Sequence, residues 1–313
     1  MSNNIKRVLC PGEALIDWVA VETKPLSLCE SFLKKAGGAP LNAAGAMQKF
    51  GVESYFMGAV GSDPFGEFLI QTMNDYHINT EYVSQINEFT TSAYVSLSED
   101  GERDFIFNRG ADMLLEIPKD FNIKKFDAVH FSSATAFLGG QLESAYNQLL
   151  SLAKENQIII TFDPNYRDAL FADKKNIFVE KSLEFISQSD IVKLSEEEAL
   201  LISERTNYLD AGKFISQLGC KYLLITLGGE GTCLFTPKAY YHLKSIQVNP
   251  VDTTGAGDAF IGSLIGLFLK RVITSDEQMQ EIVTIANTVG AITTENYGGF
   301  DSIPTLEEVV EIR

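Results

Sequence analysis

Cysteine, histidine and tryptophan are scarce in this chain. Its 313 residues include four cysteines, three histidines and one tryptophan. The cysteines lie far apart and form no CxxC pair, so we expect reduced thiols that serve as small apolar residues, and no disulfide framework. The histidines are widely spaced, and the sequence has no HExxH pattern or Cys/His cluster. These absences argue against a zinc site.

Positive charge is also in short supply. The chain has 25 Lys plus Arg against 42 Asp plus Glu, which gives a formal net charge of -17. Binding the phosphate backbone of a nucleic acid requires clustered Lys and Arg, so this balance excludes a general nucleic-acid binder. The longest acidic run is only Glu196–Glu198. The surplus of acidic residues therefore indicates a soluble surface and not an acidic tail.

No apolar run is long enough to cross a membrane. The most apolar helix candidate, Ala259–Leu269, is about half as long as the ~20 residues that a span requires. The N-terminal sequence MSNNIKRVLCPGEAL lacks the apolar core of a signal peptide. We therefore expect a cytoplasmic protein without a membrane partner.

Several well-known sequence patterns of nucleotide and hydrolase sites are missing. No GxxxxGK[ST] occurs, which excludes a Walker-type phosphate loop. No GxGxxG follows the first predicted strand, which argues against a dinucleotide-binding fold. A serine hydrolase has no support either, because GxSxG is absent.

What the chain does have is an alternation of short apolar runs and longer helical patterns. At 45% hydrophobic residues it has ample material for a large core. Apolar strands separated by helices predict a parallel sheet covered on both faces, with ligands bound beyond the carboxyl ends of the strands. Core strands are expected at Val8–Leu9, Ser54–Met57, Ala128–Phe131, Ile158–Phe162, Asp190–Lys193 and Tyr222–Thr226. Helices are expected at Leu41–Phe50, Phe65–Tyr76, Gln141–Glu155, Ile177–Ser187 and Asp210–Leu218.

Two stretches depart from this alternation. Between Thr91 and Asn108, SAYVSLS and RDFIFN flank an Asp-Gly turn and predict a β-hairpin. The segment Leu15–Lys35 also lacks a strong helical period. Together they predict a small β-sheet inserted into the larger domain; the alternative is an antiparallel extension of the main sheet.

The segment Asp252–Phe260, DTTGAGDAF, carries the clearest chemistry. Thr253 and Thr254 suit the start of a helix, whose first amides have no intrahelical partner and form an anion site. Asp258 beside such a site indicates a general base for a hydroxyl; the alternative is a first-turn acid stabilised by the helix dipole. The motif contains no lysine, so glycine amides would hold the anion. With the competing motifs absent, phosphoryl transfer is the best-supported chemistry.

A second segment, GGAPLNAA at Gly37–Ala44, also opens a helix. Gly37 and Gly38 would allow a polar ligand to lie against the backbone, and Asn42 could hydrogen-bond it. Taken alone, the segment is equally consistent with a tight strand-to-helix turn.

GGAPLNAA and DTTGAGDAF resemble, in order and spacing, the two signature regions of the ribokinase-like, PfkB-type carbohydrate kinases. GEALID, DPNYR, KLSEEE and TLGGEG match intermediate elements of that family, and GEALID, DPNYR and FNRGAD are most similar to fructokinases. The resemblance implies one α/β kinase domain over residues 1–313, with three α/β/α layers and a mostly parallel central sheet. It also implies a small β-sheet lid formed by about residues 14–36 and 91–112.

The resemblance also implies roles for individual residues. Asp258 would be the catalytic base, and the amides of Gly255, Ala256 and Gly257 would form an anion hole for the γ-phosphoryl group. The sugar would be bound by Asp17, Gly37, Gly38 and Asn42, with Arg109 closing over it and Arg167 contacting sugar or phosphates. The nucleotide would be bound by Ser195, Thr226, Gly228, Gly231, Gly257 and Asn287, the last of which matches a position facing the adenine.

Metal roles are implied as well. Glu198 would organise a Mg²⁺ shell, although Ser195 stands where the family's NxxE motif has asparagine, which puts a direct nucleotide contact there in doubt. A K⁺ loop would map onto Asp252, Thr254, Gly298 and Ser302.

The sequence therefore predicts an ATP-dependent fructokinase that makes fructose 6-phosphate. A 2-keto-3-deoxygluconate kinase is the alternative, with Arg167 pairing the substrate carboxylate. A non-catalytic sugar or nucleotide sensor is a hypothesis from another class, against which an intact Asp258 argues. The partners would be a sugar and ATP, and the small sheet could mediate a homodimer.

Overall fold

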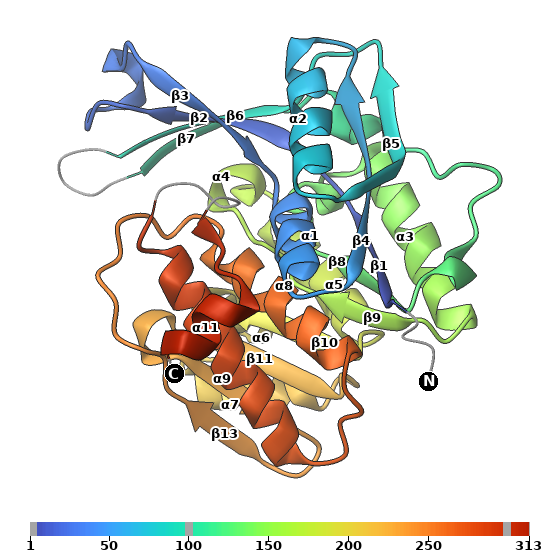
Figure 1. Cartoon of the computed structure of the whole chain (residues 1–313), viewed down its shortest axis with the longest axis vertical. Helices are drawn as coiled ribbons and strands as arrows, with labels where there is room; N and C mark the ends of the chain where they lie inside the picture. The colour runs from blue at the N-terminus through green and yellow to red at the C-terminus, as the bar shows by residue number, and fades with distance from the viewer. Residues whose placement is uncertain (1–4, 98–102, 297–301, 313) are drawn as a thin grey trace.

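A central sheet runs through the computed structural model, which describes residues 5–97, 103–296 and 302–312 (Figure 1). Its strands are parallel, except that β12 pairs antiparallel with both β11 and β13 at one edge. Across the sheet, the strands are β13 (Tyr240–Leu243), β12 (Thr232–Phe235), β11 (Tyr222–Thr226), β10 (Ile191–Ser195), β9 (Ile159–Phe162), β8 (Ala128–Phe131), β1 (Arg7–Pro11), β4 (Glu53–Gly61) and β5 (Asn79–Ile86). The six predicted core strands are all present.

Helices cover both faces of this sheet, which explains why its strands are apolar without alternation. In β1, Val8 and Cys10 belong to the core on one face, whereas Leu9 belongs to the core on the other. The first face carries α1 (Ala39–Lys49), α2 (Pro64–Asp75), α8 (Ala256–Leu269), α9 (Asp276–Thr293) and α11 (Leu306–Ile312). The second carries α3 (Gly140–Glu155), α4 (Asp168–Phe171), α5 (Lys175–Ile186), α6 (Glu196–Ser203) and α7 (Tyr208–Ser216). The five predicted helices are confirmed.

Short 3₁₀ turns occupy several of the connections. They are η1 (Leu26–Leu28), η2 (Ala111–Leu114), η3 (Ile123–Lys125), η4 (Ala136–Leu138) and η5 (Gly228–Glu230). No helix in the described part of the chain is long and apolar enough to cross a membrane.

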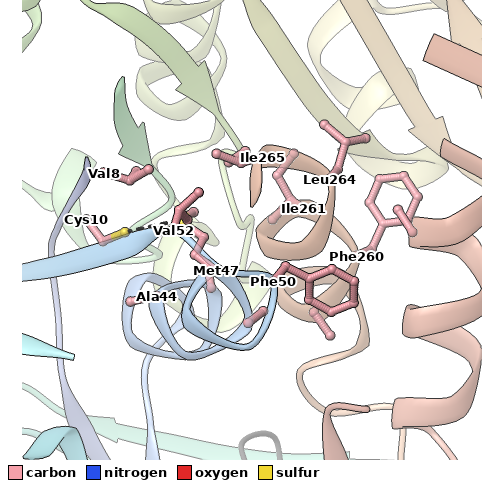
Figure 2. Close-up of a cluster of buried hydrophobic side chains, with 14 of the residues drawn as sticks. Val8, Cys10, Ala44, Met47, Phe50, Val52, Phe260, Ile261, Leu264 and Ile265 are labelled. Carbon is pink, nitrogen blue, oxygen red and sulfur yellow. Dashed lines mark hydrogen bonds between the residues drawn. The ribbon is translucent and has the colours of Figure 1, made fainter. Parts of the chain in front are cut away.

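Helices α1 and α8 pack tightly against each other on the first face. Met47 of α1 and Phe50, which directly follows α1, lie in the same buried cluster as Ile261 and Leu264 of α8 (Figure 2). A Cβ atom at Gly262 would lie 2.6 Å from the Ala43 carbonyl oxygen, so only glycine allows this approach. The close packing fixes the starts of the two helices relative to each other.

A second, smaller sheet projects from the body of the molecule (Figure 1). Its strand order is β3 (Phe32–Gly37), β2 (Leu15–Ala20), β6 (Ser92–Leu97) and β7 (Arg103–Asn108). The strands pair within this sheet and not with the central one, so the predicted insertion is confirmed and the alternative extension is wrong. The predicted Asp-Gly turn at Asp100–Gly101 lies outside the described residues.

Candidate active site

The two glycine-rich motifs meet in space through one hydrogen bond. Nδ2 of Asn42, in the first turns of α1, donates to Oδ2 of Asp258 in the first turn of α8, at 2.9 Å. Both residues are buried, at 6% and 7% exposure. The contact joins residues that are 216 positions apart in the chain. It places the predicted sugar-binding amide directly against the predicted base.

The start of α8 has the geometry of an anion site. Gly255 caps the helix in the left-handed conformation, with φ of 77°, and the helix begins at Ala256. Its first amides therefore point out of the helix end, where the dipole is positive. The predicted start at Thr253–Thr254 is early, because Oδ1 of Asp252 accepts the Thr254 amide at 2.9 Å and holds these residues in a turn.

The start of α1 brings backbone and a carboxylate together. Gly38 caps this helix with φ of 109°, and a Cβ there would overlap the Glu13 carbonyl oxygen. A Cβ at Gly37, at the end of β3, would overlap Oδ2 of Asp17 on the neighbouring strand β2. Gly37 thus leaves the space that the Asp17 carboxylate occupies. Burial raises the pKa of Asp17 to about 7, and the charge of Arg167 opposes that rise.

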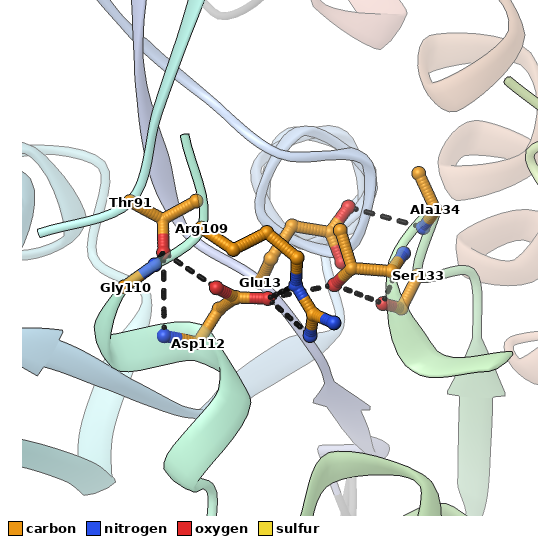
Figure 3. A network of polar contacts seen from close by, with 8 residues as sticks. Glu13, Thr91, Arg109, Gly110, Asp112, Ser133 and Ala134 are labelled. Carbon is orange, nitrogen blue, oxygen red and sulfur yellow. Dashed lines mark hydrogen bonds and ion pairs between the residues drawn. The ribbon is translucent and has the colours of Figure 1, made fainter. Parts of the chain in front are cut away.

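Arg109 lies at the junction between the small sheet and the body, where it forms an ion pair. Its Nε and Nη2 donate to Oδ2 of Asp112 at 3.0 and 2.8 Å (Figure 3). Asp112 is fully buried and also accepts hydrogen bonds from the hydroxyls of Thr91 and Thr135. This network anchors the last strand of the small sheet to the body. Closure of Arg109 over a sugar stays a prediction.

Glu13 is a buried carboxyl beside this network (Figure 3). Its Oε1 accepts the Ala134 amide at 3.2 Å, and its Oε2 has no hydrogen-bond partner in residues 5–97, 103–296 and 302–312. Burial raises the pKa of Glu13 to about 7, and hydrogen bonds to Ser133 and to backbone amides only partly oppose that shift. The folded protein therefore holds this proton more tightly than the unfolded chain does.

This shift predicts a pH-dependent effect of Glu13→Gln. The stability contributed by the proton is complete below the ordinary pKa of about 4.5 and is lost as the pH rises through about 7. Glutamine is neutral throughout, so the stability of the variant relative to the wild type should rise by up to about 3 kcal/mol between about pH 5 and about pH 8. Denaturant melts at both pH values measure this difference. The exposed Glu155→Gln is the control, and a difference that stays constant with pH would contradict the prediction.

The DPNYR motif forms a loop after β9 that holds Arg167. The guanidinium donates from Nη1 to the Tyr166 carbonyl and from Nη2 to Oδ1 of Asn165, both at 2.9 Å. Asn165 has φ of 51°, a conformation that asparagine tolerates better than most residues. Arg167 thus lies in the field of Asp17 with two of its donors already used within its own loop.

Glu198 and Ser195 form a reciprocal cap at the start of α6. The Glu198 amide donates to the Ser195 hydroxyl, and the Ser195 amide donates to Oε2 of Glu198 at 2.7 Å. Oε1 of Glu198 accepts the Tyr166 amide at 2.8 Å. The serine that departs from the family pattern therefore caps a helix, and a contact between Ser195 and a nucleotide stays a prediction.

The predicted nucleotide residues follow β11 and lie on α9. Thr226 ends β11, and a Cβ at Gly228 would meet open space, whereas a Cβ at Gly231 would overlap the carbonyl oxygen of Leu243 at the end of β13. Asn287 is buried, with Oδ1 accepting from the Thr232 hydroxyl at 2.6 Å and Nδ2 donating to the Leu243 carbonyl at 2.8 Å. Its amide links α9 to the edge strands, and a position facing adenine stays a prediction.

The predicted K⁺ loop is described only in part. Asp252 and Thr254 lie together in the turn before α8, and Ser302 is buried with a hydroxyl that has no hydrogen-bond partner among the described residues. Gly298 lies outside the described residues. The K⁺ site stays a prediction.

Three other buried polar atoms of this region also lack hydrogen-bond partners within the part of the chain that the structure describes. They are Oδ1 of Asn42, Oδ1 of Asp163 and Nδ2 of Asn165. Buried polar groups are rarely left without hydrogen bonds, so these atoms indicate a polar ligand that both donates and accepts. A polyol has this chemistry.

Three residues of this region were not predicted as site residues, namely Glu13, Asp112 and Lys193. They lie within GEALID, FNRGAD and KLSEEE, but their contacts depend on segments far apart in the chain. Lys193 offered one signal, because a charged residue in a strand covered on both faces must be buried and therefore needs a partner.

Comparisons with known proteins agree with this arrangement. The family model for pfkB family carbohydrate kinases matches residues 5–306. The chain is 35% identical over 315 residues to probable fructokinase-6, chloroplastic, of Arabidopsis thaliana, covering 97% of this chain and 81% of that protein. It is 33% identical to fructokinase-1 of Zea mays, covering 96% and 95%.

Among solved structures, the fructokinase of Vibrio cholerae O395 in its fructose-, ADP- and calcium-bound form has a TM-score of 0.86 at 26% identity. The superposition covers 98% of both chains, which confirms the predicted ribokinase-like α/β fold. Because the family model and the relatives extend over almost the whole sequence, the chain belongs to the pfkB family of carbohydrate kinases.

Proposed function

We propose that this enzyme transfers the γ-phosphoryl group of ATP to the primary hydroxyl at C6 of fructose. The hydrogen bond between Asn42 and Asp258 carries the proposal, because it joins a polyol-binding motif to a carboxylate at a helix end built for an anion. The Arabidopsis and maize relatives named as fructokinases support fructose as the acceptor.

In the proposed reaction, Asp258 accepts the proton of the sugar hydroxyl. The hydroxyl oxygen then forms a bond to the γ-phosphorus, and the bond from that phosphorus to the bridging oxygen of ADP breaks. The amides of Gly255, Ala256 and Gly257 face the charge that develops on the transferred group. Asp17, Gly38 and Asn42 orient the sugar so that one hydroxyl lies against the base.

The residues present fit a Mg²⁺–ATP substrate. The described residues contain no cluster of three or more Asp, Glu, His or Cys side chains able to hold a metal alone. Mg²⁺ is usually bound by phosphates and water with one or two carboxylates, and Glu198 would supply one. The Mg²⁺ ion would neutralise part of the phosphate charge. A K⁺ ion near Asp252 and Thr254 would neutralise more of that charge.

The structure offers less support for 2-keto-3-deoxygluconate as the acceptor. Arg167 would have to bind the substrate carboxylate in a fork, but two of its donors bind its own loop. The Asp17 carboxylate in the same field would repel a second carboxylate. A neutral sugar suits this pair of charges better. A non-catalytic sensor performs no proton transfer, so it would not need the general base Asp258.

A sugar panel tests the proposal. Mg²⁺ and ATP are supplied with fructose, ribose, 2-keto-3-deoxygluconate or a nucleoside, and ADP release is coupled to a spectroscopic readout. We expect fructose to give the highest kcat/KM. Faster turnover of the keto acid would select the alternative substrate, and ADP release with no acceptor preference would contradict a sugar kinase.

We also propose that the small sheet acts as a lid and as a dimer surface. Leu33 of β3 is 53% exposed, on the same face as Phe105 and Phe107 of β7. A second copy would cover these apolar side chains.

The cytoplasmic location of the protein stays a prediction.

A further inference from the structure

Lys193 is buried beside the start of α8. Among the described residues it is the only lysine or arginine that is buried, with 7% of its surface exposed. It lies on β10, where its neighbour in register is Leu224 of β11, and it faces the same side of the sheet as Ile191. That side is the one covered by α8, so the sequence places an ammonium group where the core would otherwise be apolar.

The Lys193 ammonium reaches the predicted anion hole. A Cβ built on Gly257 would lie 2.9 Å from Nζ of Lys193 and 3.6 Å from its Cε. Gly257 is therefore a glycine partly because the lysine occupies the space of its side chain. Glycine amides alone were expected to form this anion site, since DTTGAGD contains no lysine; the fold adds a cation from β10, much earlier in the chain.

Acidic groups surround this cation. Nζ donates to Oδ2 of Asp163 at 2.9 Å, and the carboxylates of Glu198 and Asp258 also lie in its field. Burial alone would lower the pKa of Lys193, but these three carboxylates raise it, so the group stays an ammonium ion. Within the described part of the chain, this group of three N–H donors makes one hydrogen bond, to Asp163.

Phosphoryl transfer would place a negatively charged group among carboxylates, and the Lys193 ammonium would oppose the resulting repulsion. The transferring group carries negative charge on its equatorial oxygens, and it must do so next to Asp258, Asp163 and Glu198. Unopposed, this repulsion in a buried site would raise the barrier. Helix-end amides supply only partial positive charge, equivalent to about half an elementary charge. Lys193 supplies a full charge beside Gly257, one of the residues of this hole.

We propose that the Lys193 ammonium binds the phosphoryl group as it is transferred and completes the anion hole from the sheet side. The proposal rests on the proposed kinase function and adds a catalytic residue to it. The alternative role is structural: Lys193 would only neutralise the buried Asp163, which would otherwise be an unpaired charge.

Replacing both Lys193 and Asp163 by neutral residues distinguishes the catalytic role of Lys193 from the structural one. Lys193→Met alone should lower kcat by about 10²-fold or more, with much smaller changes in KM, as expected for the loss of one group that stabilises a transition-state charge. The double variant Lys193→Met with Asp163→Asn removes both charges and should restore thermal stability. We expect its kcat to stay as low as that of Lys193→Met. Recovery of kcat together with stability would overturn the proposal.

A matched control uses another ion-paired lysine. Lys181 of α5 is 25% exposed and pairs with Glu143 at 3.4 Å. Lys181→Met should leave kcat unchanged. A similar fall in kcat for both lysines would mean that the effect is not specific to the site.

Binding of a transition-state analogue gives a readout without turnover. Calorimetry with ADP, Mg²⁺, the preferred sugar and aluminium fluoride should show tight binding to the wild type and a loss of about 10²-fold in affinity for Lys193→Met. The affinity for ADP and sugar without aluminium fluoride should change little. An equal loss with and without the analogue would overturn the proposal. Failure of the proposed function would look different, because the wild type itself would phosphorylate no sugar of the panel.

Discussion

Asp258→Asn is expected to lower kcat by about 10²- to 10⁴-fold. Asparagine has nearly the same shape as aspartate and can keep the hydrogen bond to Asn42, so the site should stay assembled. What it loses is the ability to accept the proton of the sugar hydroxyl, and a positioned general base contributes about this factor. The affinity for ATP should be nearly unchanged, because the amides of the α8 start remain.

Steady-state kinetics with the preferred sugar and calorimetry with ATP measure the two quantities. Asp276→Asn is a matched control, since Asp276 is also a buried acid in the first turn of a helix, α9, where its carboxylate binds Thr236 and Tyr241. If Asp258 only stabilised the helix dipole, the two variants would behave alike. Unchanged turnover in Asp258→Asn would remove this residue from the mechanism.

Gly37→Ala is expected to reduce kcat/KM for the sugar by roughly 10- to 100-fold. The new methyl group would overlap Oδ2 of Asp17, so the carboxylate would have to leave its position between β2 and β3. Losing hydrogen bonds between a charged group and sugar hydroxyls is worth about this factor. Most of the effect should appear in KM for the sugar, and KM for ATP should change little.

A double-mutant cycle tests whether Gly37 acts through Asp17. Asp17→Asn alone should also raise KM for the sugar. If the alanine acts by displacing that carboxylate, then combining the two substitutions should cost little more than Asp17→Asn alone, because residues in contact are not additive. Fully additive losses would show that the alanine disturbs something else, such as the cap of α1 at Gly38.

Sequence patterns predicted the buried parts of the fold and were less informative at its edges. Apolar strands such as β8 and β11 stand out because both their faces are covered. The strands β5 and β13 lie at the two edges of the sheet, and Tyr82 is the one buried residue in the two strands together, so they lack that pattern. Helix α6 is short and begins with three glutamates, so its few apolar residues give no clear helical period in the sequence.

The candidate site shows a similar division. Asp258 and Asn42 could be identified because each lies close to glycines at a predicted helix start, where backbone amides are open to a ligand, and the structure brings the two residues into contact. The hydrogen bonds of Asp112 with Thr91 and Thr135 and the approach of Lys193 to Gly257 could not be identified in this way. Each depends on how separate strands and helices are placed, and no local spacing encodes that placement.

Phosphoryl transfer from ATP to O6 of fructose is the reaction on which the proposed roles of Asp258, Asp17 and Lys193 all depend. The decisive experiment is to incubate the protein with Mg²⁺, ATP and fructose and to identify the product by phosphorus and carbon NMR. We expect one ADP for each fructose 6-phosphate, with the phosphate on the primary hydroxyl at C6. Phosphate on another oxygen, or ADP formed without any sugar phosphate, would contradict the proposed reaction.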